Sequence, residues 1–255
     1  MAAKVIAIIN QKGGVGKTTT TFELCSIFKS ANCRVLAIDM DPQCSLSSLM
    51  KADMKAYSIL DAMLGNCDAE HIIQHCKYGD ILTSNGNLAS YEKRFNGKAR
   101  EYRLKEVIAP LKEKYDFIFI DSPPALGILT VGLLTASDGF VIPAAADIFS
   151  LEGIKQIYET YKAVKTYTNP DLQIYGVLLT RYNFDFDKKV YALIYNLCKK
   201  LGIDLFPAII AEAVEVRESL VYSKSLLDYA PESKACESYK VFAKYLARKA
   251  KGGQN

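Results

Sequence analysis

The stretch Asn10-Gln11-Lys12-Gly13-Gly14-Val15-Gly16-Lys17-Thr18-Thr19 decides the fold of this 255-residue chain. It follows an apolar run, Val5–Ile9, and precedes a segment compatible with a helix, Lys17–Ala31. Glycines let backbone amides turn toward one anion without Cβ clashes, and a helix N-terminus adds partial positive charge at the same place. The order of strand, glycine-rich loop and helix therefore predicts a phosphate-binding loop.

Two lysines and a threonine define the chemistry expected of this loop. Lys17 supplies a mobile ammonium for β- and γ-phosphates, and the hydroxyl of Thr18 is placed to bind Mg²⁺. The general P-loop pattern has glycine where this chain has Gln11, and a second lysine, Lys12, stands directly before the glycines. The loop residues predicted to bind nucleotide are Lys12, Gly13, Gly14, Val15, Gly16, Lys17, Thr18 and Thr19.

The composition is that of an ordinary globular protein. Of the residues, 50% are hydrophobic and 24% are charged, and we expect one α/β domain over residues 1–250 with a flexible tail at 251–255. The net charge of +4 is small, so a nucleic-acid surface would have to be a local patch. Seven scattered cysteines without a Cys-x-x-Cys pair favour a reducing cytoplasm, and no apolar run is long enough for stable membrane insertion.

Short β-branched or aromatic runs alternate with amphipathic segments of helix length. This alternation is typical of βα units and predicts an α/β fold of the P-loop NTPase type, a twisted, mainly parallel sheet with helices on both faces. The predicted strands are Lys4–Asn10, Arg34–Asp39, Asp80–Thr83, Phe117–Asp121, Gly139–Pro143, Ile174–Thr180 and Asp204–Ile210. The predicted helices are Lys17–Ala31, Ser58–Leu64, Arg103–Lys114, Ile128–Ala136, Leu151–Tyr167, Lys188–Leu201, Val214–Tyr222 and Ser233–Lys249.

Acidic residues stand at the carboxyl ends of predicted strands, where open α/β sheets bind their ligands. The second strand closes on Asp39 and Asp41, and the fourth closes on Asp121. Asp121 ends an apolar run, the setting of a carboxylate that holds Mg²⁺, and Asp41 can face the γ-phosphate and orient the attacking water. Aspartates also cap helices and begin turns, but three of them in a chain with this loop favour a site. The predicted metal-binding residues are Thr18, Asp39 and Asp121.

The loop and the strand ends together resemble one family of nucleotide-driven switches. Lys-Gly-Gly-x-Gly-Lys-Thr at residues 12–18 is similar to the deviant Walker A loop of the ParA, MinD and nitrogenase iron protein class. Three further segments resemble the ParA/Soj partition ATPases in their order and spacing: Asp39–Gln43, Tyr115–Pro124 and Leu151–Gly153. The resemblance implies a Mg²⁺-dependent ATPase that binds ATP or ADP and dimerises around ATP. It further implies DNA partition as the process and a ParB-like centromere-binding activator as partner.

Three residues receive catalytic roles from this resemblance. Asp41 matches the hydrolytic residue, and Lys12 matches the lysine that reaches the nucleotide of the partner subunit. Lys17 and Thr18 match the phosphate and Mg²⁺ ligands. The predicted catalytic residues are therefore Asp41, Lys12 and Lys17.

The chain departs from the family near its C-terminal third. Family members usually carry Ile-Pro-Arg-Asn-Val-Arg where this chain has Ile210-Ala211-Glu212-Ala213-Val214-Glu215. The resemblance places adenine contacts at Ala211 and Ala213, through backbone groups. It places Glu212 and Glu215 where arginines touch DNA. A carboxylate repels phosphate, so nonspecific DNA binding at this element is expected to be weakened.

Other charged or metal-ligating groups leave alternatives open. The C-terminal helix has a basic amphipathic pattern that could touch DNA or an anionic membrane, although such helices more often pack on the core. The run Lys93–Lys105 is a second basic patch or a solvated helix surface. His71 and His75, with Cys67 and Cys76 nearby, lack the further ligand spacing of a zinc site, so no metal is predicted there.

Two other functions compete with DNA partition. A MinD-like positioning or regulatory switch would act on a protein or membrane surface and not on DNA, and the two glutamates favour it. An iron protein like nitrogenase reductase would need bridging cysteines after the fourth and fifth strands, and the chain has none between Cys76 and Cys198. We therefore expect a cytoplasmic ATPase switch, associated with the nucleoid if it binds DNA.

Overall fold

The fold is built on one eight-stranded sheet. The computed structural model describes residues 2–94 and 99–252, without the side chain of Glu92. The strands are β1 (Lys4–Ile8), β2 (Val35–Asp39), β3 (Gln74–Cys76), β4 (Gly79–Leu82), β5 (Phe117–Asp121), β6 (Gly139–Ala145), β7 (Gln173–Tyr182) and β8 (Leu205–Ala211). They lie in the order β3-β4-β2-β5-β1-β6-β7-β8, and all neighbours are parallel except β3 and β4.

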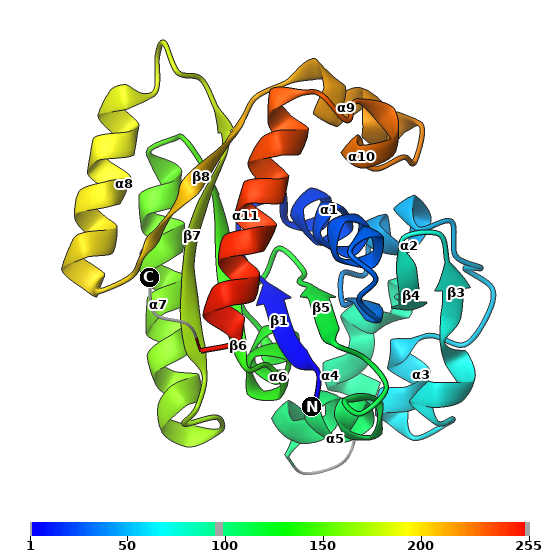
Figure 1. Ribbon diagram of the computed structural model, residues 1–255. Coiled ribbons are helices and arrows are strands. Elements are labelled where there is room, and N and C mark those ends of the chain that lie inside the picture. Colours follow the sequence, from blue (N-terminus) through cyan, green and yellow to red (C-terminus); the bar gives the residue numbers. More distant parts are fainter. Residues whose placement is uncertain (1, 95–98, 253–255) are drawn as a thin grey trace.

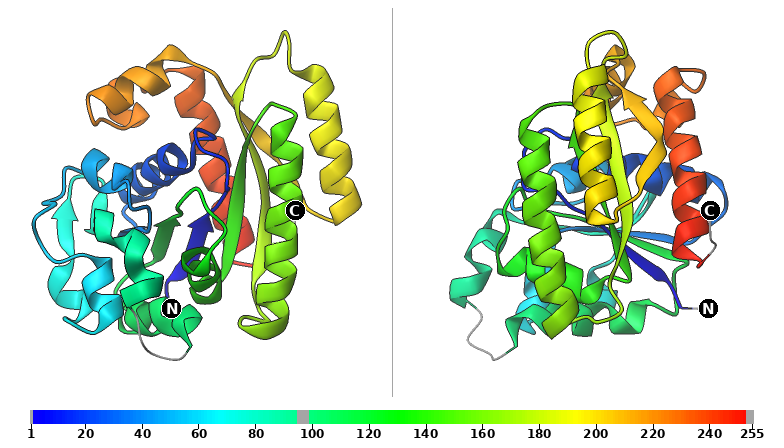
Figure 2. Two further views of the ribbon diagram at one scale, coloured as in Figure 1. Left: turned by 180° about the vertical axis from the view of Figure 1, so that it is seen from behind. Right: turned by 90° about the vertical axis from the view of Figure 1, so that its left-hand side faces the viewer.

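Helices lie on both faces of this sheet, as Figures 1 and 2 show. The α-helices are α1 (Lys17–Ser30), α2 (Ser45–Leu49), α3 (Ile59–Leu64), α4 (Tyr91–Arg94), α5 (Arg103–Ile108), α6 (Ile128–Ala136), α7 (Phe149–Tyr167), α8 (Lys188–Leu201), α9 (Val214–Val221), α10 (Leu226–Tyr229) and α11 (Lys234–Ala250). Short 3₁₀ helices occupy Ala69–Ile72, Gly86–Ser90, Arg100–Tyr102 and Ala109–Leu111. The predicted fold class, a mainly parallel P-loop NTPase sheet covered on both faces, is confirmed.

The alternation of side chains along each strand feeds two separate cores. In β1, Val5 and Ala7 face one core, and Ile6 and Ile8 face the other. The first core is completed by α3, α5, α6, α7 and α8, and the second by α1, α2, α10 and α11. A strand buried on both faces needs apolar residues at every position, which explains the continuous hydrophobic runs of the sequence.

One short strand and three short α-helices were not predicted from the sequence. β3 is a three-residue antiparallel strand at the sheet edge, and α2, α4 and α10 have four or five residues each. Segments of this length are too short to show a helical or strand period. Such elements are therefore visible only after the longer ones have been packed.

The histidines considered as metal ligands do not share a helix face. His71 lies in a 3₁₀ helix and His75 in β3. His75 Nδ1 lies 2.8 Å from Asp80 Oδ1, and His71 Nδ1 lies 3.7 Å from Asp68 Oδ2. Within residues 2–94 and 99–252, no group of three or more His, Cys, Asp or Glu side chains could hold a metal ion. In the same ranges no helix has the length and apolar character needed to cross a membrane.

Candidate nucleotide site

Two glycines let the loop between β1 and α1 turn back on itself. Gly14 has φ 74° and Gly16 has φ 84°, a left-handed backbone that residues with a Cβ rarely adopt. The loop is tied to β7, where the hydroxyl of Thr180 donates to the Val15 carbonyl oxygen at 2.9 Å. Gly16 directly precedes α1, and no described side chain caps that helix. The first amides of α1 therefore point into the loop, where they can bind an anion.

Lys17 is held inside this loop. Its side chain is buried, and Nζ donates a hydrogen bond to the Lys12 carbonyl oxygen at 3.2 Å. Burial lowers the pKa of Lys17, while the carboxylates of Asp121 and Asp41 oppose that shift. The ammonium therefore lies where the loop can bind a phosphate and where its charge is only partly balanced by the protein.

Thr18 and Asp121 form the second polar contact of the site. The Thr18 hydroxyl donates to Asp121 Oδ2 at 2.7 Å, and Asp121 is fully buried at the end of β5. Asp121 Oδ1 is buried without a hydrogen-bond partner among the described residues. Burial and the nearby Asp39 raise the pKa of Asp121 well above its ordinary value. An unpaired carboxylate oxygen beside a hydroxyl is a donor set that suits a hard cation, so these residues fit Mg²⁺.

Asp39 and Asp41 lie at the end of β2 and have different surroundings. Asp39 Oδ1 accepts from the Asp41 amide at 3.0 Å, and its Oδ2 accepts from the amide and hydroxyl of Ser47 at 2.8 and 2.7 Å. Burial raises the pKa of Asp39 to about 6. Asp41 Oδ1 accepts from the Gln43 amide at 2.9 Å. The Asp39 oxygens thus hold the loop that carries Asp41. Direct contact between Asp39 and a metal ion stays a prediction.

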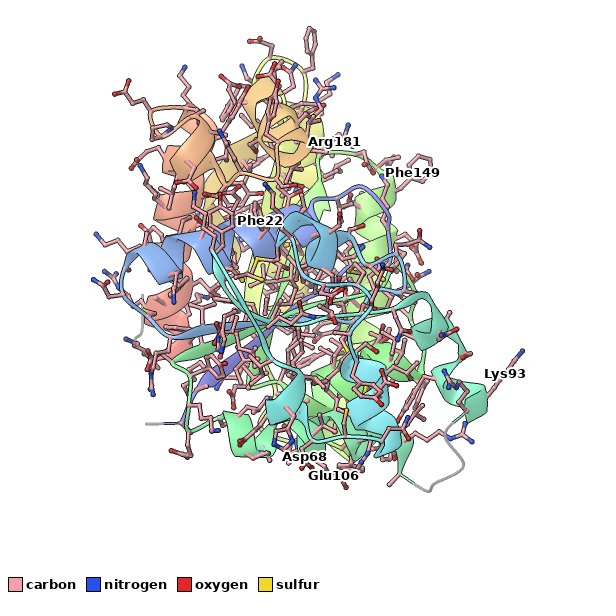
Figure 3. All side chains as sticks on the ribbon, turned by 90° about the vertical axis from the view of Figure 1, so that its right-hand side faces the viewer. Phe22, Asp68, Lys93, Glu106, Phe149 and Arg181 are labelled. Carbon is pink, nitrogen blue, oxygen red and sulfur yellow. The ribbon has the colours of Figure 1, made fainter. Side chains whose placement is uncertain are left out.

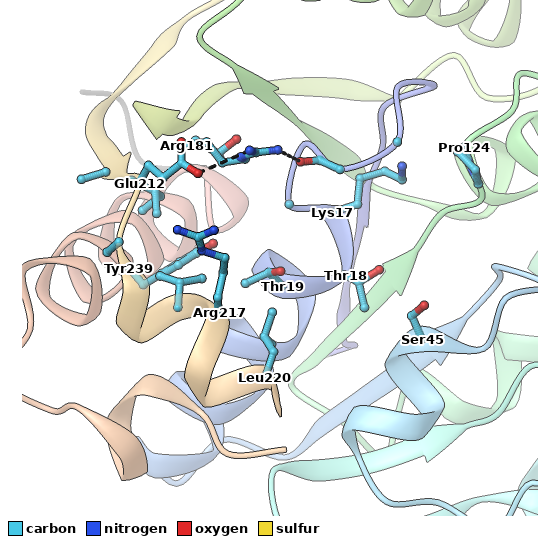
Figure 4. A pocket seen from close by; sticks show the side chains of 18 of the residues that line it. Lys17, Thr18, Thr19, Ser45, Pro124, Arg181, Glu212, Arg217, Leu220 and Tyr239 are labelled. Atoms are coloured by element: carbon cyan, nitrogen blue, oxygen red, sulfur yellow. Dashed lines mark hydrogen bonds and ion pairs between the residues drawn. The ribbon is translucent and has the colours of Figure 1, made fainter. Parts of the chain in front are cut away.

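A cavity of about 460 Å³ opens over the loop, which is a size that suits a small-molecule ligand. We call its two sides the P-loop end and the α9 end, and Figure 4 shows residues of both. The P-loop end is lined by Gly13, Gly14, Gly16, Lys17, Thr18, Thr19 and Asp41. The α9 end is lined by Ile210, Ala211, Glu212, Ala213, Val216, Arg217, Leu220 and Tyr239.

The fold gathers most of the predicted site residues around this cavity, from the first loop to Ala211 and Ala213 near the C-terminus. Val15, Asp39 and Asp121 are buried and do not line it. The remaining predicted residue, Lys12, is also absent from the lining. The cavity therefore joins segments that lie about two hundred positions apart in the sequence.

Lys12 is turned to a neighbouring surface. Its ammonium forms an ion pair with Asp147 and lies 5.5 Å from the centroid of the Phe149 ring. The Lys12 side chain is 34% exposed, and Phe149 is 73% exposed. Figure 3 shows Phe149 projecting outward at the same end of the molecule as Arg181. The second lysine of the loop thus stands at the surface beside an exposed aromatic ring.

Sequence reasoning missed three charged residues, which are Asp147, Arg181 and Arg217. Arg181 has a left-handed backbone with φ 52° and donates from Nη1 to the Gly14 carbonyl oxygen at 3.3 Å. Arg217 lines the cavity from α9. Asp147 follows the carboxyl end of β6, and Arg181 stands near the carboxyl end of β7. The sequence criterion selected acidic residues at the ends of predicted strands, so it passed over the basic Arg181 and over Asp147, which lies beyond the predicted end of its strand at Pro143. Arg217 lies within α9 and gave no strand-end signal.

The glutamates expected to face DNA differ in their contacts. Glu212 Oε1 lies 3.3 Å from Arg181 Nη2, so its charge is paired with a residue of the site, as Figure 4 shows. Glu215 lies in the first turn of α9, where a carboxylate interacts favourably with the helix dipole. The carboxylate repulsion expected from the sequence therefore applies more directly to Glu215 than to Glu212.

The two basic stretches are only partly available to a ligand. In Lys93–Lys105, Lys93 is exposed, and Figure 3 shows it projecting into solvent; Lys98 lies outside the described residues. Arg103 donates from Nε to the Met63 carbonyl oxygen at 2.7 Å and pairs with Glu106. On α11, the apolar side packs in the second core, as expected for a surface helix.

Comparisons with known proteins agree with this geometry. A family model described as AAA domain matches residues 3–174. The sporulation initiation inhibitor protein Soj of Bacillus subtilis is 36% identical over 250 residues, which cover 96% of this chain and 98% of that protein. The chromosome partitioning protein ParA of Myxococcus xanthus is 34% identical over 253 residues, which cover 96% of this chain and 88% of that protein.

A solved structure has the same fold over nearly the whole chain. It is cobyrinic acid a,c-diamide synthase from Mycobacterium smegmatis with a bound ATP analogue and magnesium. The TM-score is 0.86 at 28% identity, covering 99% of this chain and 97% of that one. These similarities confirm the resemblance carried by the loop and the strand ends, and the chain belongs to the ParA/Soj family of Mg²⁺-dependent P-loop ATPases.

Proposed function

We propose that this ATPase is a dimerising switch for DNA partition. The relatives Soj and ParA support partition as the process. The position of Lys12 supports the dimer, because its ammonium belongs to the phosphate-binding loop yet lies at the surface beside Asp147, outside the cavity. A lysine in that position can pair with phosphates bound by a second copy of the chain. This placement of Lys12 is the observation on which the proposal depends.

The proposed roles follow the surroundings of each residue. Lys17 and the loop amides bind the phosphates, and Thr18 and Asp121 hold Mg²⁺, which neutralises phosphate charge when bound. Asp41 orients a water whose oxygen bonds to the γ-phosphorus as the bond to ADP breaks, releasing ADP and phosphate. Asp39 keeps the Asp41 loop in place through Ser47. Backbone groups of Ala211 and Ala213 border the base.

ATP hydrolysis would act as the timer of the switch. Contacts that Lys12 makes with the phosphates of the partner exist only in the ATP state, so loss of the γ-phosphate shifts the population back to monomers. Because both cores share one sheet, we propose that residues 1–250 act as a single domain, with 251–255 as a tail.

Sedimentation with Mg²⁺ and ATP tests the dimer. The wild type should shift from monomer to dimer, and Lys12→Ala should stay monomeric while keeping nucleotide affinity within about tenfold. Lys17→Ala should lose nucleotide binding by about a hundredfold or more, because it removes the ammonium inside the loop. A Lys12→Ala protein that dimerises like the wild type would overturn the assignment of Lys12.

The proposed partners are a ParB-like activator that binds a centromere and nonspecific DNA, which would place this cytoplasmic protein on the nucleoid. DNA binding is expected to be weak at the β8–α9 element because Glu212 and Glu215 stand there. Because of those glutamates, the second candidate function is a MinD-like switch that acts on a protein or membrane surface and not on DNA. Cosedimentation with ATP separates the two, since DNA partition requires binding to DNA and the alternative requires binding to anionic vesicles or a protein without DNA.

A further inference from the structure

The α9 end of the cavity offers very few side chains that can form hydrogen bonds with a base. Five of its lining side chains are aliphatic: Ile210, Ala211, Ala213, Val216 and Leu220. Such a lining can bury a flat ring but cannot distinguish one purine from another. Besides the backbone groups of Ala211 and Ala213, discrimination must therefore come from the polar side chains that remain.

Two of the three polar side chains at this end already have partners. The Tyr239 hydroxyl lies 3.3 Å from the Thr20 hydroxyl and is fully buried with it. The Glu212 carboxylate pairs with Arg181. The third is Arg217, whose guanidinium has no hydrogen bond or ion pair within residues 2–94 and 99–252. Figure 4 shows its side chain reaching from α9 into the pocket.

A guanidinium has only donors, and this limits the base edges that it can recognise. Guanine presents two adjacent acceptors, O6 and N7, which arginine binds in a bidentate manner. Adenine presents N7 beside the N6 amino group, which is itself a donor. Arginine therefore forms one hydrogen bond with that edge of adenine and two with that edge of guanine.

We propose that Arg217 selects the nucleobase and lets the site accept 6-oxopurine nucleotides, such as those of guanine, in addition to adenine nucleotides. The inference rests on the proposed nucleotide site and adds a specificity determinant to it. Arg217 approaches the base edge from α9, while the P-loop end holds the phosphates in the same way for every nucleotide. Among the side chains of the α9 end, Arg217 is then the one that adds a preference for O6 and N7 to the contacts of the backbone.

The test is calorimetric titration with Mg²⁺ and nucleoside diphosphates, which avoids hydrolysis. Wild-type protein should bind GDP and IDP, which both carry O6 and N7, within about tenfold of ADP. Arg217→Ala should lose about tenfold in affinity for GDP and IDP and about threefold or less for ADP, in line with the loss of two hydrogen bonds or one. Arg217→Gln should favour ADP over GDP, because an amide pairs with adenine N6 and N7.

Arg248→Ala is the matched control, since Arg248 is an exposed arginine of α11 and does not line this cavity. It should leave all affinities unchanged. The inference is overturned if the wild type prefers ADP over GDP by more than about tenfold, or if Arg217→Ala weakens ADP, GDP and CDP equally, as a phosphate contact would. ADP binding without any effect of Arg217 would overturn this inference alone. Absence of binding by every nucleotide would overturn the proposed function as well.

Discussion

The P-loop end and the α9 end of the cavity differ in how firmly the protein holds their polar groups. At the P-loop end, the ammonium of Lys17 and the hydroxyl of Thr18 each donate to a group of the protein, and Asp121 is fully buried. At the α9 end, most lining side chains are aliphatic and Arg217 has no partner in the described part of the chain. The groups proposed to bind phosphate are therefore already held in position, whereas the side chain proposed to recognise the base is exposed and is held by no partner in the described part of the chain.

This difference follows from how each end is encoded. Phosphate binding uses backbone amides and side chains of one continuous loop, so its residues appear together in the sequence. The α9 end is assembled from β8, α9 and α11, which only the folded sheet brings beside α1.

The largest effect is expected at the P-loop end, from Asp41→Ala. Removing the carboxylate that we propose orients the attacking water should lower the rate of ATP hydrolysis by about a hundredfold or more, while ATP binding and dimerisation remain. Phosphate release in the steady state, with ATP affinity measured in parallel, checks this. Asp171→Ala, an exposed aspartate elsewhere, should hydrolyse ATP normally. A near-normal rate in Asp41→Ala would remove Asp41 from the mechanism.

Asp39→Ala sharpens the same comparison, because its carboxylate holds the loop through Ser47 and the Asp41 amide. This variant should lose stability as well as activity, since three buried hydrogen bonds disappear. If Asp39→Ala behaved like Asp41→Ala, with full stability, the positioning role assigned to Asp39 would be wrong.

Much of the P-loop end could be predicted from the sequence, and much of the α9 end could not. The fold class and its long strands follow from hydrophobic runs, and the family follows from the loop motif. The ion pair of Lys12 with Asp147 joins positions that no local pattern links, and the pairing of Glu212 with Arg181 depends on the register of β7 and β8. The sequence shows which charges exist, but only the packed sheet shows which of them neutralise one another.

A buried glutamate links the two ends. Glu23 lies on α1, directly after the P-loop, and accepts hydrogen bonds from the Leu226 amide of α10 at 3.1 Å. The Ser26 hydroxyl donates to the Ser225 hydroxyl at 2.7 Å beside it. Burial raises the pKa of Glu23 to about 8. The segment after α9 is thus fastened to the P-loop helix by a carboxyl group that holds its proton more tightly in the folded state than in the unfolded state.

Replacing Glu23 is therefore expected to change the free energy of unfolding and its dependence on pH, an effect smaller than that of Asp41→Ala on hydrolysis. Because the folded pKa of Glu23 is raised, its contribution is most favourable at acidic pH and is lost as the pH rises to about 8, by at most roughly 1.4 kcal/mol per pH unit. Glu23→Gln keeps an acceptor for the Leu226 amide and cannot ionise. It should be more stable than the wild type at pH 8 and similar to it at pH 5.

Urea unfolding at several pH values measures this difference. Glu113→Gln, which changes an exposed glutamate, should follow the wild type throughout. If Glu23→Gln lost as much stability between pH 5 and pH 8 as the wild type does, Glu23 would not be the group responsible. A destabilised variant at every pH would show instead that the charged form holds α10 to α1.

The smallest effect is expected at the outer side of the α9 end, from Glu215→Arg. Glu215 is the better probe of the two glutamates, because replacing Glu212 would also release Arg181 from its ion pair next to Gly14. An arginine at position 215 that meets a DNA phosphate should strengthen ATP-dependent DNA binding several-fold and steepen the slope of log K against log salt by about one. It also removes an acidic residue from the first turn of α9, at a cost of about 0.3–1 kcal/mol, so unfolding is measured alongside.

Binding to a random duplex over a salt series, with Glu113→Arg as a control of equal charge, separates a local contact from a general gain in positive charge. Equal gains in both variants, or no gain in Glu215→Arg, would show that this surface is not the one that faces DNA.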